Sequence, residues 1–460
     1  MTNSPLKQAW LNLPPNALQQ HIESYWLIPQ VLPILGFSLT ENEVVQSYKT
    51  GFGNEAVDIA VRKSTTDDKF SHDKSDPSLI IEIKNRGTNL DSNSNPYKNT
   101  VAQLKRYFLP QATNCSKTKW GIITNADNIQ LFRHHGKVVY PFTTNIKITA
   151  DNIDEKIALI KQYIDNDYKA LTIALYNNKD GVGKTTTAIN LAGILSIPLP
   201  EGFGKKVLVV DFDPNQKDLT DLLNIAPGKI KFWNYLQTHK KQSVSIKDVV
   251  SSYQVKLPNG KFHKVFDVIP ADEEFLRNSS NQSKTKDILI TILNPLLNEY
   301  DYIIIDAPPG LTPFTDEAIR ASDVVLMPSK HNGLASFKNA AVAMTQIFPK
   351  IGSDRRIYNP ELADPTPLPI FFNGEQITTA QKKQAQEAIR QVLEDTKQKE
   401  QIDLENFFFP KIVPGNEDLS IFELPSNAHI ASSAFSNRPA VIFSKVARGY
   451  YKQLVEEYFL

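Results

Sequence analysis

The chain has 460 residues, of which 41% are hydrophobic, enough for two or three domains with well-buried cores. Its formal net charge is only +1, so any binding to nucleic acid must depend on local basic patches. The single cysteine, Cys115, excludes an internal disulfide and a cysteine-based zinc site.

The first ten residues, MTNSPLKQAW, lack the pattern of a signal peptide. Apolar runs in the chain do not approach the length of a membrane span. We therefore expect a cytoplasmic protein, with association with the nucleoid as an option, and no membrane partner.

Two short predicted strands near the N-terminus each carry an acid. Residues 55–61 (EAVDIAV) alternate in polarity and place Asp58 inward. Residues 79–85 (LIIEIKN) place Glu82 and Lys84 two positions apart, so both point to one face. The two acids can hold a divalent metal through hard oxygen ligands. The lysine can polarise a water or stabilise charge on a phosphodiester.

A helix and a hairpin follow these strands. Residues 101–108 (VAQLKRYF) predict a helix with Gln103 and Tyr107 on one face. Residues 120–133 contain two strand patterns, WGIITN and NIQLFR. The D…E-x-K spacing resembles the PD-(D/E)XK nuclease superfamily. With the Q-x-x-x-Y helix and the hairpin, residues 15–145 are similar to the N-terminal nuclease domain of type I restriction endonuclease subunits.

The nuclease resemblance implies a restriction-endonuclease-like α/β domain. In it Asp58 and Glu82 bind Mg²⁺, with Mn²⁺ as a second option, and Lys84 and Gln103 complete the catalytic set. Glu23, on the first predicted helix, supplies an accessory carboxylate. Two alternatives stay open, because such a domain either cleaves DNA or keeps the fold only to grip DNA.

A helical pattern separates this domain from the rest of the chain. Residues 151–167 (DNIDEKIALIKQYIDND) start with Asp and place four isoleucines on one stripe. We therefore predict a nuclease-like domain at 1–150, a linker helix at 151–168 and a second domain at 169–460.

Residues 171–195 (LTIALYNNKDGVGKTTTAINLAGIL) predict the strand–loop–helix of a phosphate-binding site. Glycines in the loop let backbone N–H groups converge on phosphate oxygens, and the helix N-terminus points to the same place. Lys184 would neutralise the β- and γ-phosphates, and the Thr185 hydroxyl would bind Mg²⁺. This part of the sequence therefore predicts an ATP site.

The loop deviates from the general phosphate-binding loop, because it has Asn178 at a glycine position and an additional lysine, Lys179. The sequence KDGVGKTT resembles the K-G-G-x-G-K-T loop of ParA/MinD ATPases, with Asp180 in place of a glycine. Asp tolerates a left-handed backbone, so the turn can survive. The predicted nucleotide-binding residues of the loop are Lys179, Asp180, Gly181, Val182, Gly183, Lys184, Thr185 and Thr186.

Two later strand patterns end in acids. Residues 206–213 (KVLVVDFD) predict a strand that delivers Asp211 and Asp213 on one face. Residues 302–310 (YIIIDAPPG) end in Asp306 before a Pro-Pro-Gly turn, which suits a carboxylate that supports a magnesium ion. The predicted metal ligands and supports in this domain are Thr185, Asp211 and Asp306.

The ParA/MinD resemblance covers residues 171–460 and implies a P-loop NTPase domain with a mostly parallel sheet flanked by helices. It implies that Lys179 reaches the partner's nucleotide in an ATP-bound homodimer and that Asp213 orients the attacking water. It also implies that Asn373, in the apolar run PIFFNG, reads the adenine edge.

The predicted fold class is α/β, with the two domains described above. The leading hypothesis is an ATP-dependent, dimerising, DNA-binding ATPase that controls an attached Mg²⁺-dependent endonuclease, in genome defence or mobile-element control. The alternative is a plasmid or chromosome partition ATPase of the ParA type, whose N-terminal domain only binds DNA or a protein partner. In that alternative a regulatory partner would stimulate hydrolysis.

Short basic clusters are the candidate DNA contacts. Three cations border the predicted nuclease cleft, and three basic pairs lie in the ATPase half. They are Lys98, Lys105 and Arg106, followed by Lys240-Lys241, Arg355-Arg356 and Lys382-Lys383.

Overall fold

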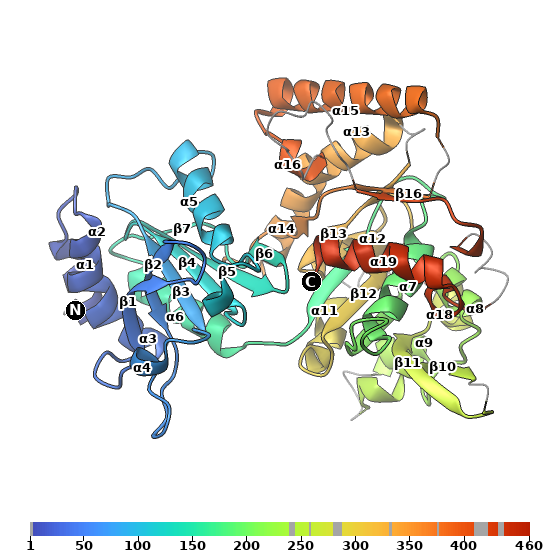
Figure 1. The fold of residues 1–460 in the computed structure, drawn as a ribbon, viewed down its shortest axis with the longest axis horizontal. Helices are drawn as coiled ribbons and strands as arrows, with labels where there is room; N and C mark the ends of the chain where they lie inside the picture. The colour runs from blue at the N-terminus through green and yellow to red at the C-terminus, as the bar shows by residue number, and fades with distance from the viewer. Residues whose placement is uncertain are drawn as a thin grey trace. The chain divides into compact units, whose positions relative to one another are not determined.

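The computed structural model describes residues 3–238, 244–256, 259–278, 288–330, 334–374, 377–408, 422–430 and 437–460. The chain forms two compact units. Unit 1 consists of Met1–Asp167, Asn359–Ala363 and Phe459; unit 2 consists of Tyr168–Tyr358, Asp364–Tyr458 and Leu460. Figure 1 shows both, coloured along the chain.

Unit 1 is built on a seven-stranded mixed sheet in the order β1-β2-β3-β4-β5-β6, with β7 also paired to β5. Strands β3 and β4 run parallel, and the other neighbours run antiparallel. The strands are β1 (Val44–Lys49), β2 (Ala56–Val61), β3 (Leu79–Ile83), β4 (Trp120–Thr124), β5 (Asn128–His135), β6 (Val138–Pro141) and β7 (Ile146–Lys147).

Helices surround this sheet. Helix α5 begins after Ser94, whose hydroxyl accepts a hydrogen bond from the Tyr97 N–H as an N-cap. Helix α6, which covers most of the predicted linker, belongs to unit 1 and packs on α1 and α3. The helices are α1 (Pro5–Asn12), α2 (Gln19–Ile22), η1 (Glu23–Val31), α3 (Leu32–Leu35), α4 (Phe70–Asp73), α5 (Asn95–Arg106), η2 (Thr113–Cys115) and α6 (Ile153–Asp165).

A segment from late in the sequence completes unit 1. Residues 359–363 lie against the connection between β6 and β7, where Leu362 forms an antiparallel bridge with Thr143. The Thr144 N–H donates to Glu361 O at 2.7 Å, and Lys156 Nζ lies 3.2 Å from Glu361 Oε1. Unit 1 is therefore discontinuous in sequence, which the predicted boundary at residue 150 did not anticipate.

Unit 2 contains a larger sheet in the order β10-β11-β9-β12-β8-β13-β15, which is parallel except for the β10–β11 pair. A small parallel sheet follows the order β14-β16-β17. The strands are β8 (Leu171–Leu175), β9 (Val207–Asp211), β10 (Ser251–Lys256), β11 (Phe262–Ile269), β12 (Tyr302–Asp306), β13 (Val324–Leu326), β14 (Pro328–Ser329), β15 (Thr366–Pro367), β16 (Phe371–Asn373) and β17 (Glu423–Leu424).

Unit 2 includes α-helices on both faces of the larger sheet and several short 3-10 or π segments. They are α7 (Lys184–Ser196), α8 (Asp218–Leu222), α9 (Phe232–Thr238), η3 (Ile246–Asp248), α10 (Glu273–Asn278), α11 (Ile288–Leu293), η5 (Asn294–Leu296), α12 (Pro313–Arg320), α13 (Leu334–Val342), η6 (Ala343–Ile347), α14 (Phe348–Arg355), α15 (Thr379–Glu400), α16 (Glu405–Phe408), α18 (Ala440–Phe443) and α19 (Lys445–Tyr458).

Helix α7 is the most enclosed of these elements. It packs against strands β8, β9, β11 and β12 on one side and against α18 and α19 on the other, as Figure 1 shows. Gly193 permits the close approach of α18, because a Cβ there would lie 2.6 Å from Val441 Cγ2. Asn190 Oδ1 accepts a hydrogen bond from the Val441 N–H at 3.1 Å. This packing fixes the helix whose N-terminus forms the phosphate-binding site.

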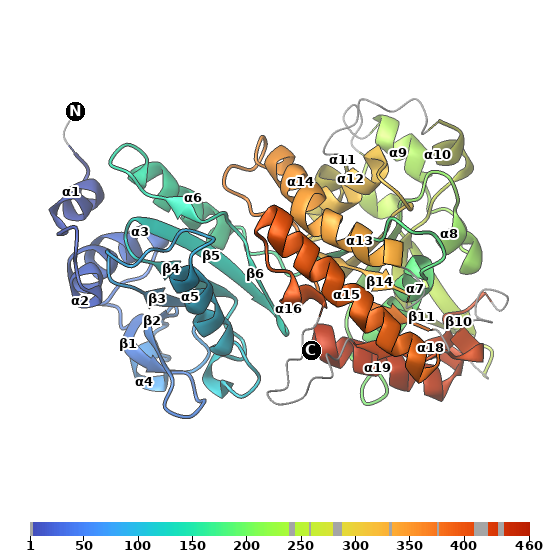
Figure 2. The same cartoon turned by 90° about the horizontal axis from the view of Figure 1, so that it is seen from above.

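Helix α15, 22 residues long, lies along α13 in Figures 1 and 2. Its capping box joins Thr378 and Gln381, and its buried side chains are Ala385, Ile389 and Val392. Its remaining surface is largely polar. Within the part of the chain that the structure describes, helices with the length and apolarity needed to span a bilayer are absent.

Candidate functional sites

The phosphate-binding loop connects β8 to α7. Gly183 is the N-cap of α7 with φ +88°, and Gly181 has φ +69°. Asp180 is not in the left-handed region, contrary to the sequence expectation, so the non-glycine residue carries no backbone strain. Val182 is fully buried under the loop, and Thr186 lies in the first turn of the helix.

Lys184 and Thr185 take the positions expected of a phosphate lysine and a metal-binding hydroxyl. Lys184 is 8% exposed, and burial lowers its pKa, while the charges of Asp306, Asp180 and Asp213 oppose that shift. The Thr185 hydroxyl donates to Asp306 Oδ2 at 2.6 Å. Thr185 and Asp306, which the sequence assigned to one magnesium site, are therefore in direct contact.

Asp306 has the character of a metal-supporting carboxylate. Its second oxygen, Oδ1, is buried and has no hydrogen-bond partner among the described residues. Burial raises its pKa to about 7. An unpartnered buried carboxylate oxygen beside a threonine hydroxyl forms a hard-oxygen donor set, which suits Mg²⁺. The residues present therefore fit the predicted ion.

The structure separates Asp211 from Asp213, which the sequence placed on one strand face. Strand β9 ends at Asp211, whose Oδ2 accepts hydrogen bonds from the N–H and the hydroxyl of Thr220. Burial raises the pKa of Asp211 to about 8. Asp213 lies in the following loop, half-buried, and accepts a hydrogen bond from the Asn215 N–H at 2.8 Å.

Lys179 and Asn373 differ in their surroundings. Lys179 is half-buried, and its side chain has no ion-pair partner among the residues described. Its N–H donates to Asn177 Oδ1 at 2.9 Å, which anchors the start of the loop. Asn373, for which adenine recognition stays a prediction, donates from Nδ2 to Val182 O at 2.8 Å. In this structure its amide braces the phosphate-binding loop.

A second cluster lies at the end of β3 in unit 1. Glu82 is 2% exposed, and Lys84 Nζ lies 2.6 Å from Glu82 Oε1. Asp58, on the neighbouring strand β2, accepts hydrogen bonds from the Ile83 N–H at 2.6 Å and from Gln19 Nε2. Burial raises the pKa of both acids, and the charge of Asp58 raises that of Glu82 further.

Helix α5 supplies the two residues of the Q-x-x-x-Y pattern. Lys84 Nζ donates to Gln103 Oε1 at 2.8 Å, and Gln103 Nε2 donates to the Tyr107 hydroxyl at 2.6 Å. That hydroxyl lies 3.0 Å from Glu82 Oε2. Strand and helix therefore form a closed hydrogen-bonded ring around the buried acid.

Glu23 lies at the start of η1 and accepts a hydrogen bond from Gln46 Nε2. Burial raises its pKa, and the charge of Asp58 adds to that shift. Gln19 and Gln46 are the site residues that sequence reasoning missed, because isolated glutamines carry no motif. Groups of three or more His, Cys, Asp or Glu side chains close enough to hold a metal are absent from the described residues.

The predicted basic patches have different outcomes. Lys240-Lys241 lies outside the described residues. Arg355 is buried, and Arg356 pairs with Asp364 at 2.7 Å, so this pair is structural. Arg106 pairs with Glu55 at 3.0 Å and Lys382 with Glu423 at 3.0 Å, both at the surface. Surface pairs of this kind are weak enough to exchange for phosphate.

Comparison with known proteins finds a family match within unit 2 and similarity to several bacterial proteins. Residues 170–358 match the family model described as AAA domain. The chain is 34% identical over 163 residues to the sporulation initiation inhibitor protein Soj of Bacillus subtilis (strain 168), covering 34% of this chain and 56% of that protein. It is 33% identical over 162 residues to the chromosome-partitioning ATPase Soj of Thermus thermophilus, covering 35% and 55%.

The chromosome partitioning protein ParA of Myxococcus xanthus is 34% identical over 158 residues, which are 34% of this chain and 50% of that protein. The chain thus spans about half the length of the curated relatives it matches. Residues 170–358 thus match the AAA domain model, and the chain is similar to Soj and ParA proteins over about a third of its length.

Proposed function

We propose that this chain is an ATP-dependent, DNA-binding ATPase of the chromosome- or plasmid-partition type, in which bound ATP joins two copies. The observation that carries the proposal is the contact between the Thr185 hydroxyl and Asp306 beside the buried Lys184 at the N-terminus of α7. The similarity to Soj and ParA partition proteins supports it. In this function unit 1 binds DNA or a protein partner.

In this function, different residues of the site bind the phosphates, the metal ion and the attacking water. Backbone N–H groups after Gly181 and the N-terminus of α7 bind phosphate oxygens. Thr185 and Asp306 would hold Mg²⁺, which would neutralise charge on the phosphates. Asp213 orients the attacking water, and Lys179, which has no ion-pair partner among the described residues, reaches the nucleotide of the second copy. Hydrolysis then requires positioning and charge neutralisation and no covalent intermediate on the protein.

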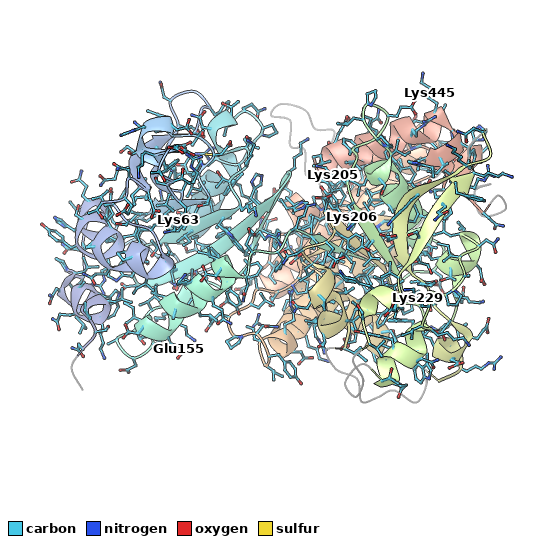
Figure 3. All side chains as sticks on the ribbon, turned by 90° about the horizontal axis from the view of Figure 1, so that it is seen from below. Lys63, Glu155, Lys205, Lys206, Lys229 and Lys445 are labelled. Atoms are coloured by element: carbon cyan, nitrogen blue, oxygen red, sulfur yellow. The ribbon has the colours of Figure 1, made fainter. Side chains whose placement is uncertain are left out.

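Helix α19 offers a basic surface for DNA. Lys445, Arg448 and Lys452 recur at spacings of three and four residues, along one margin of the buried stripe that includes Tyr451. Arg448 pairs with Glu201. Lys452 Nζ lies 5.9 Å from the ring centroid of Phe203 and donates to Pro200 O at 3.2 Å. Figure 3 labels the exposed Lys445 together with Lys205 and Lys206. These cations suit sequence-independent phosphate contacts.

Sedimentation velocity of the full chain with Mg²⁺ and either ATP or ADP tests the ATP switch. We expect a dimer with ATP and a monomer with ADP. Lys179→Ala should bind ATP yet stay monomeric. Lys231→Ala, at a surface lysine paired with Glu274, is the matched control and should dimerise. A parent chain that stays monomeric with ATP and Mg²⁺ would overturn the proposal.

DNA binding is tested by co-sedimentation with plasmid DNA in the same nucleotide states. We expect ATP-dependent binding that weakens steeply with salt, because phosphate contacts release counterions. Lys445→Ala combined with Lys452→Ala should weaken binding without changing ATP-dependent dimerisation. Equal DNA binding with ATP and ADP would contradict the proposed switch.

A second candidate function is metal-dependent cleavage of DNA by unit 1, which would act in genome defence or mobile-element control. The closed ring of Glu82, Lys84, Gln103 and Tyr107, with Asp58 beside it, favours this candidate. The two acids suit Mg²⁺ or Mn²⁺, which would activate water and stabilise charge on the phosphodiester. Lys84 is placed to stabilise that charge as well.

Incubation with supercoiled and linear DNA, with Mg²⁺ or Mn²⁺ and with or without ATP, tests this candidate. We expect strand breaks that Glu82→Gln and Lys84→Ala abolish. Glu155→Gln, at an exposed acid of α6 labelled in Figure 3, is the matched control and should cut like the parent. Breaks that persist in Glu82→Gln, or no breaks under any condition, would reject the nuclease and leave the partition function standing.

A further inference from the structure

The turn between β1 and β2 in unit 1 presents an aromatic side chain to solvent. Phe52 is 38% exposed and lies between Gly51, with φ +87°, and Gly53, with φ +54°. The left-handed backbone of the two glycines on either side of Phe52 makes a tight turn at the end of the hairpin. The exposed part of this aromatic ring is not packed in the hydrophobic core and is therefore available to contact a ligand.

The tip is held rigidly. The Asn114 N–H donates to Thr50 O at 3.0 Å, and the Phe52 N–H donates to the Thr50 hydroxyl at 3.3 Å. A Cβ on Gly51 would stand 2.5 Å from the Thr113 hydroxyl, so the turn lies directly against η2. Because the turn is already ordered, contacts made by its ring lose little to further ordering.

The base of the turn is connected to the acidic cluster. The Tyr107 hydroxyl lies 3.2 Å from Ala56 O, in the first residue of β2, and 3.0 Å from Glu82 Oε2. Arg106 Nε, one residue earlier on α5, donates to Glu55 Oε1 at 3.0 Å. Lys49, on the other side of the turn, is exposed. The hairpin that carries the ring therefore has Lys49 and Arg106 at its base, where Lys49 Nζ donates to Asn54 O at 3.3 Å, and it is joined to the acidic cluster through Tyr107.

We propose that Phe52 stacks on an unpaired nucleobase, so that unit 1 prefers single-stranded or locally unpaired DNA to intact duplex. Aromatic side chains stack on bases that have left their helix, whereas the bases of a duplex are already stacked on one another. Lys49 and Arg106 bind the flanking phosphates, Arg106 by exchanging Glu55 for phosphate. This inference rests on the proposed DNA binding by unit 1 and adds its substrate class.

The test is the affinity of the full chain, by fluorescence anisotropy without divalent metal, for oligothymidylate, a duplex with an unpaired bulge, and an intact duplex. We expect Phe52→Ala to weaken binding to the first two about tenfold, the loss expected for one stacked base. Binding to the intact duplex should change less than twofold. Phe262→Ala, at an exposed phenylalanine of unit 2, is the matched control and should leave all three affinities unchanged.

Phe52→Leu separates stacking from general apolar contact, since leucine keeps apolar area without an aromatic face; it should behave like Phe52→Ala. Phe52→Trp should retain the preference, and its added fluorescence should be quenched by oligothymidylate. Loss of affinity for all three DNAs alike, or for none, would overturn the inference while leaving DNA binding in place. Absence of binding to all three DNAs by the parent chain would instead remove the proposed DNA binding by unit 1, while the ATP-dependent binding is judged by the co-sedimentation experiment.

Discussion

Lys84 Nζ lies 2.6 Å from Glu82 Oε1, and this pair joins a buried carboxylate to the only cation that contacts it among the described residues. Glu82 is enclosed on its other side by the Tyr107 hydroxyl, and the charge of Asp58 acts on it as well. The charged form of a buried acid with one cationic partner depends on that partner, because removing the partner leaves an uncompensated buried charge. The stability of the fold around this cluster should therefore depend on pH and on substitution of either partner.

We expect Glu82→Gln to stabilise unit 1 at pH 8, since burial raises the pKa of Glu82 and so disfavours its charged form in the folded state. In the folded state this acid keeps its proton to higher pH than in the unfolded state. Stability is therefore greatest below the unfolded pKa and falls as pH rises through the folded pKa. The gain of the variant should shrink toward pH 5.

Hydrogen exchange of the β3 amides at pH 5 and pH 8, corrected for intrinsic rates, measures this difference. Lys84→Met is the opposite case and should destabilise β3 more at pH 8 than at pH 5. A Glu82→Gln variant that loses stability at pH 8 would show that the charged carboxylate is a net stabilising group.

Asp211→Asn should stabilise the nucleotide-free chain at pH 8. Burial raises the pKa of Asp211 to about 8, so the folded state holds a proton that the unfolded state has already lost. Stability is lost as pH rises between about 4 and about 8, and the variant is free of that loss. We expect a gain of about 1–3 kcal/mol at pH 8, smaller than full linkage gives, because water reaches buried charges.

Thermal unfolding of unit 2 followed from pH 5 to pH 8 is the measurement for Asp211→Asn. The parent's melting temperature should fall relative to the variant as pH rises. Thr220→Val, which removes the hydroxyl that donates to Asp211 Oδ2 at 2.6 Å, provides the comparison and should destabilise the chain. Parallel pH curves for the parent and Asp211→Asn would contradict the expected proton uptake.

Thr185→Ala should reduce ATP hydrolysis by about 100-fold, the size of effect expected when one group that stabilises transition-state charge is lost. The hydroxyl donates to Asp306 and, in the proposed function, would bind the magnesium ion. Thr185→Ser keeps the hydroxyl and should retain most of the activity. Because Thr185 is only half-buried, neither variant should unfold the chain.

Phosphate release at saturating ATP, with Mg²⁺ varied, tests this expectation. Thr185→Ala should show no Mg²⁺-dependent rise in melting temperature with ATP, whereas Thr185→Ser should show one. Equal magnesium dependence in the two variants would place the ion elsewhere.

Asn373→Ala should loosen the phosphate-binding loop. Its Nδ2 donates to Val182 O at 2.8 Å, and a neutral hydrogen bond of this kind contributes about 1 kcal/mol. ATP binding should weaken about fivefold, the factor that follows from that energy. If Asn373 reads the adenine edge instead, Asn373→Ala should reduce discrimination between ATP and GTP, and competition binding with the two nucleotides separates the roles.

Gly183→Ala should affect the phosphate-binding loop more severely than Asn373→Ala, because the new side chain would collide with Asn373. A Cβ there would stand 2.2 Å from Asn373 Nδ2, and φ +88° already strains any side chain. ATP binding should be lost. The double variant with Asn373→Ala should recover part of it, because the clash is removed while the strain remains. A double variant no better than Gly183→Ala alone would show that strain dominates.

Periodicity made the positions of the ATP-site residues readable from the sequence. Lys184, Thr185 and Asp306 stand at the ends of apolar strands or at the start of a helix, so local pattern locates them. The pattern cannot give the orientation of a side chain at the end of a strand. Asp211 turns to Thr220, and Asn373 turns to Val182, because tertiary neighbours supply the donors and acceptors.

In the acidic cluster, too, local pattern locates some residues, whereas others join only through the tertiary fold. Asp58, Glu82 and Lys84 come from adjacent strands, and alternation predicts that they share a face. Gln19 and Gln46 join the cluster from distant elements that are close only in the folded unit. The segment 359–363 is a still longer-range case, since nothing in its composition indicates that it belongs to unit 1.

That segment determines when unit 1 can finish folding. The bridge between Leu362 and Thr143 and the bond from the Thr144 N–H to Glu361 O require residues that the ribosome adds after most of unit 2. The nascent N-terminal part must therefore wait, with one edge incomplete, while helices α7 to α14 emerge. A truncated translation product that stops before residue 359 would lack the bridge and the hydrogen bond that this segment makes. Only chains that extend past residue 363 would therefore complete this edge of unit 1.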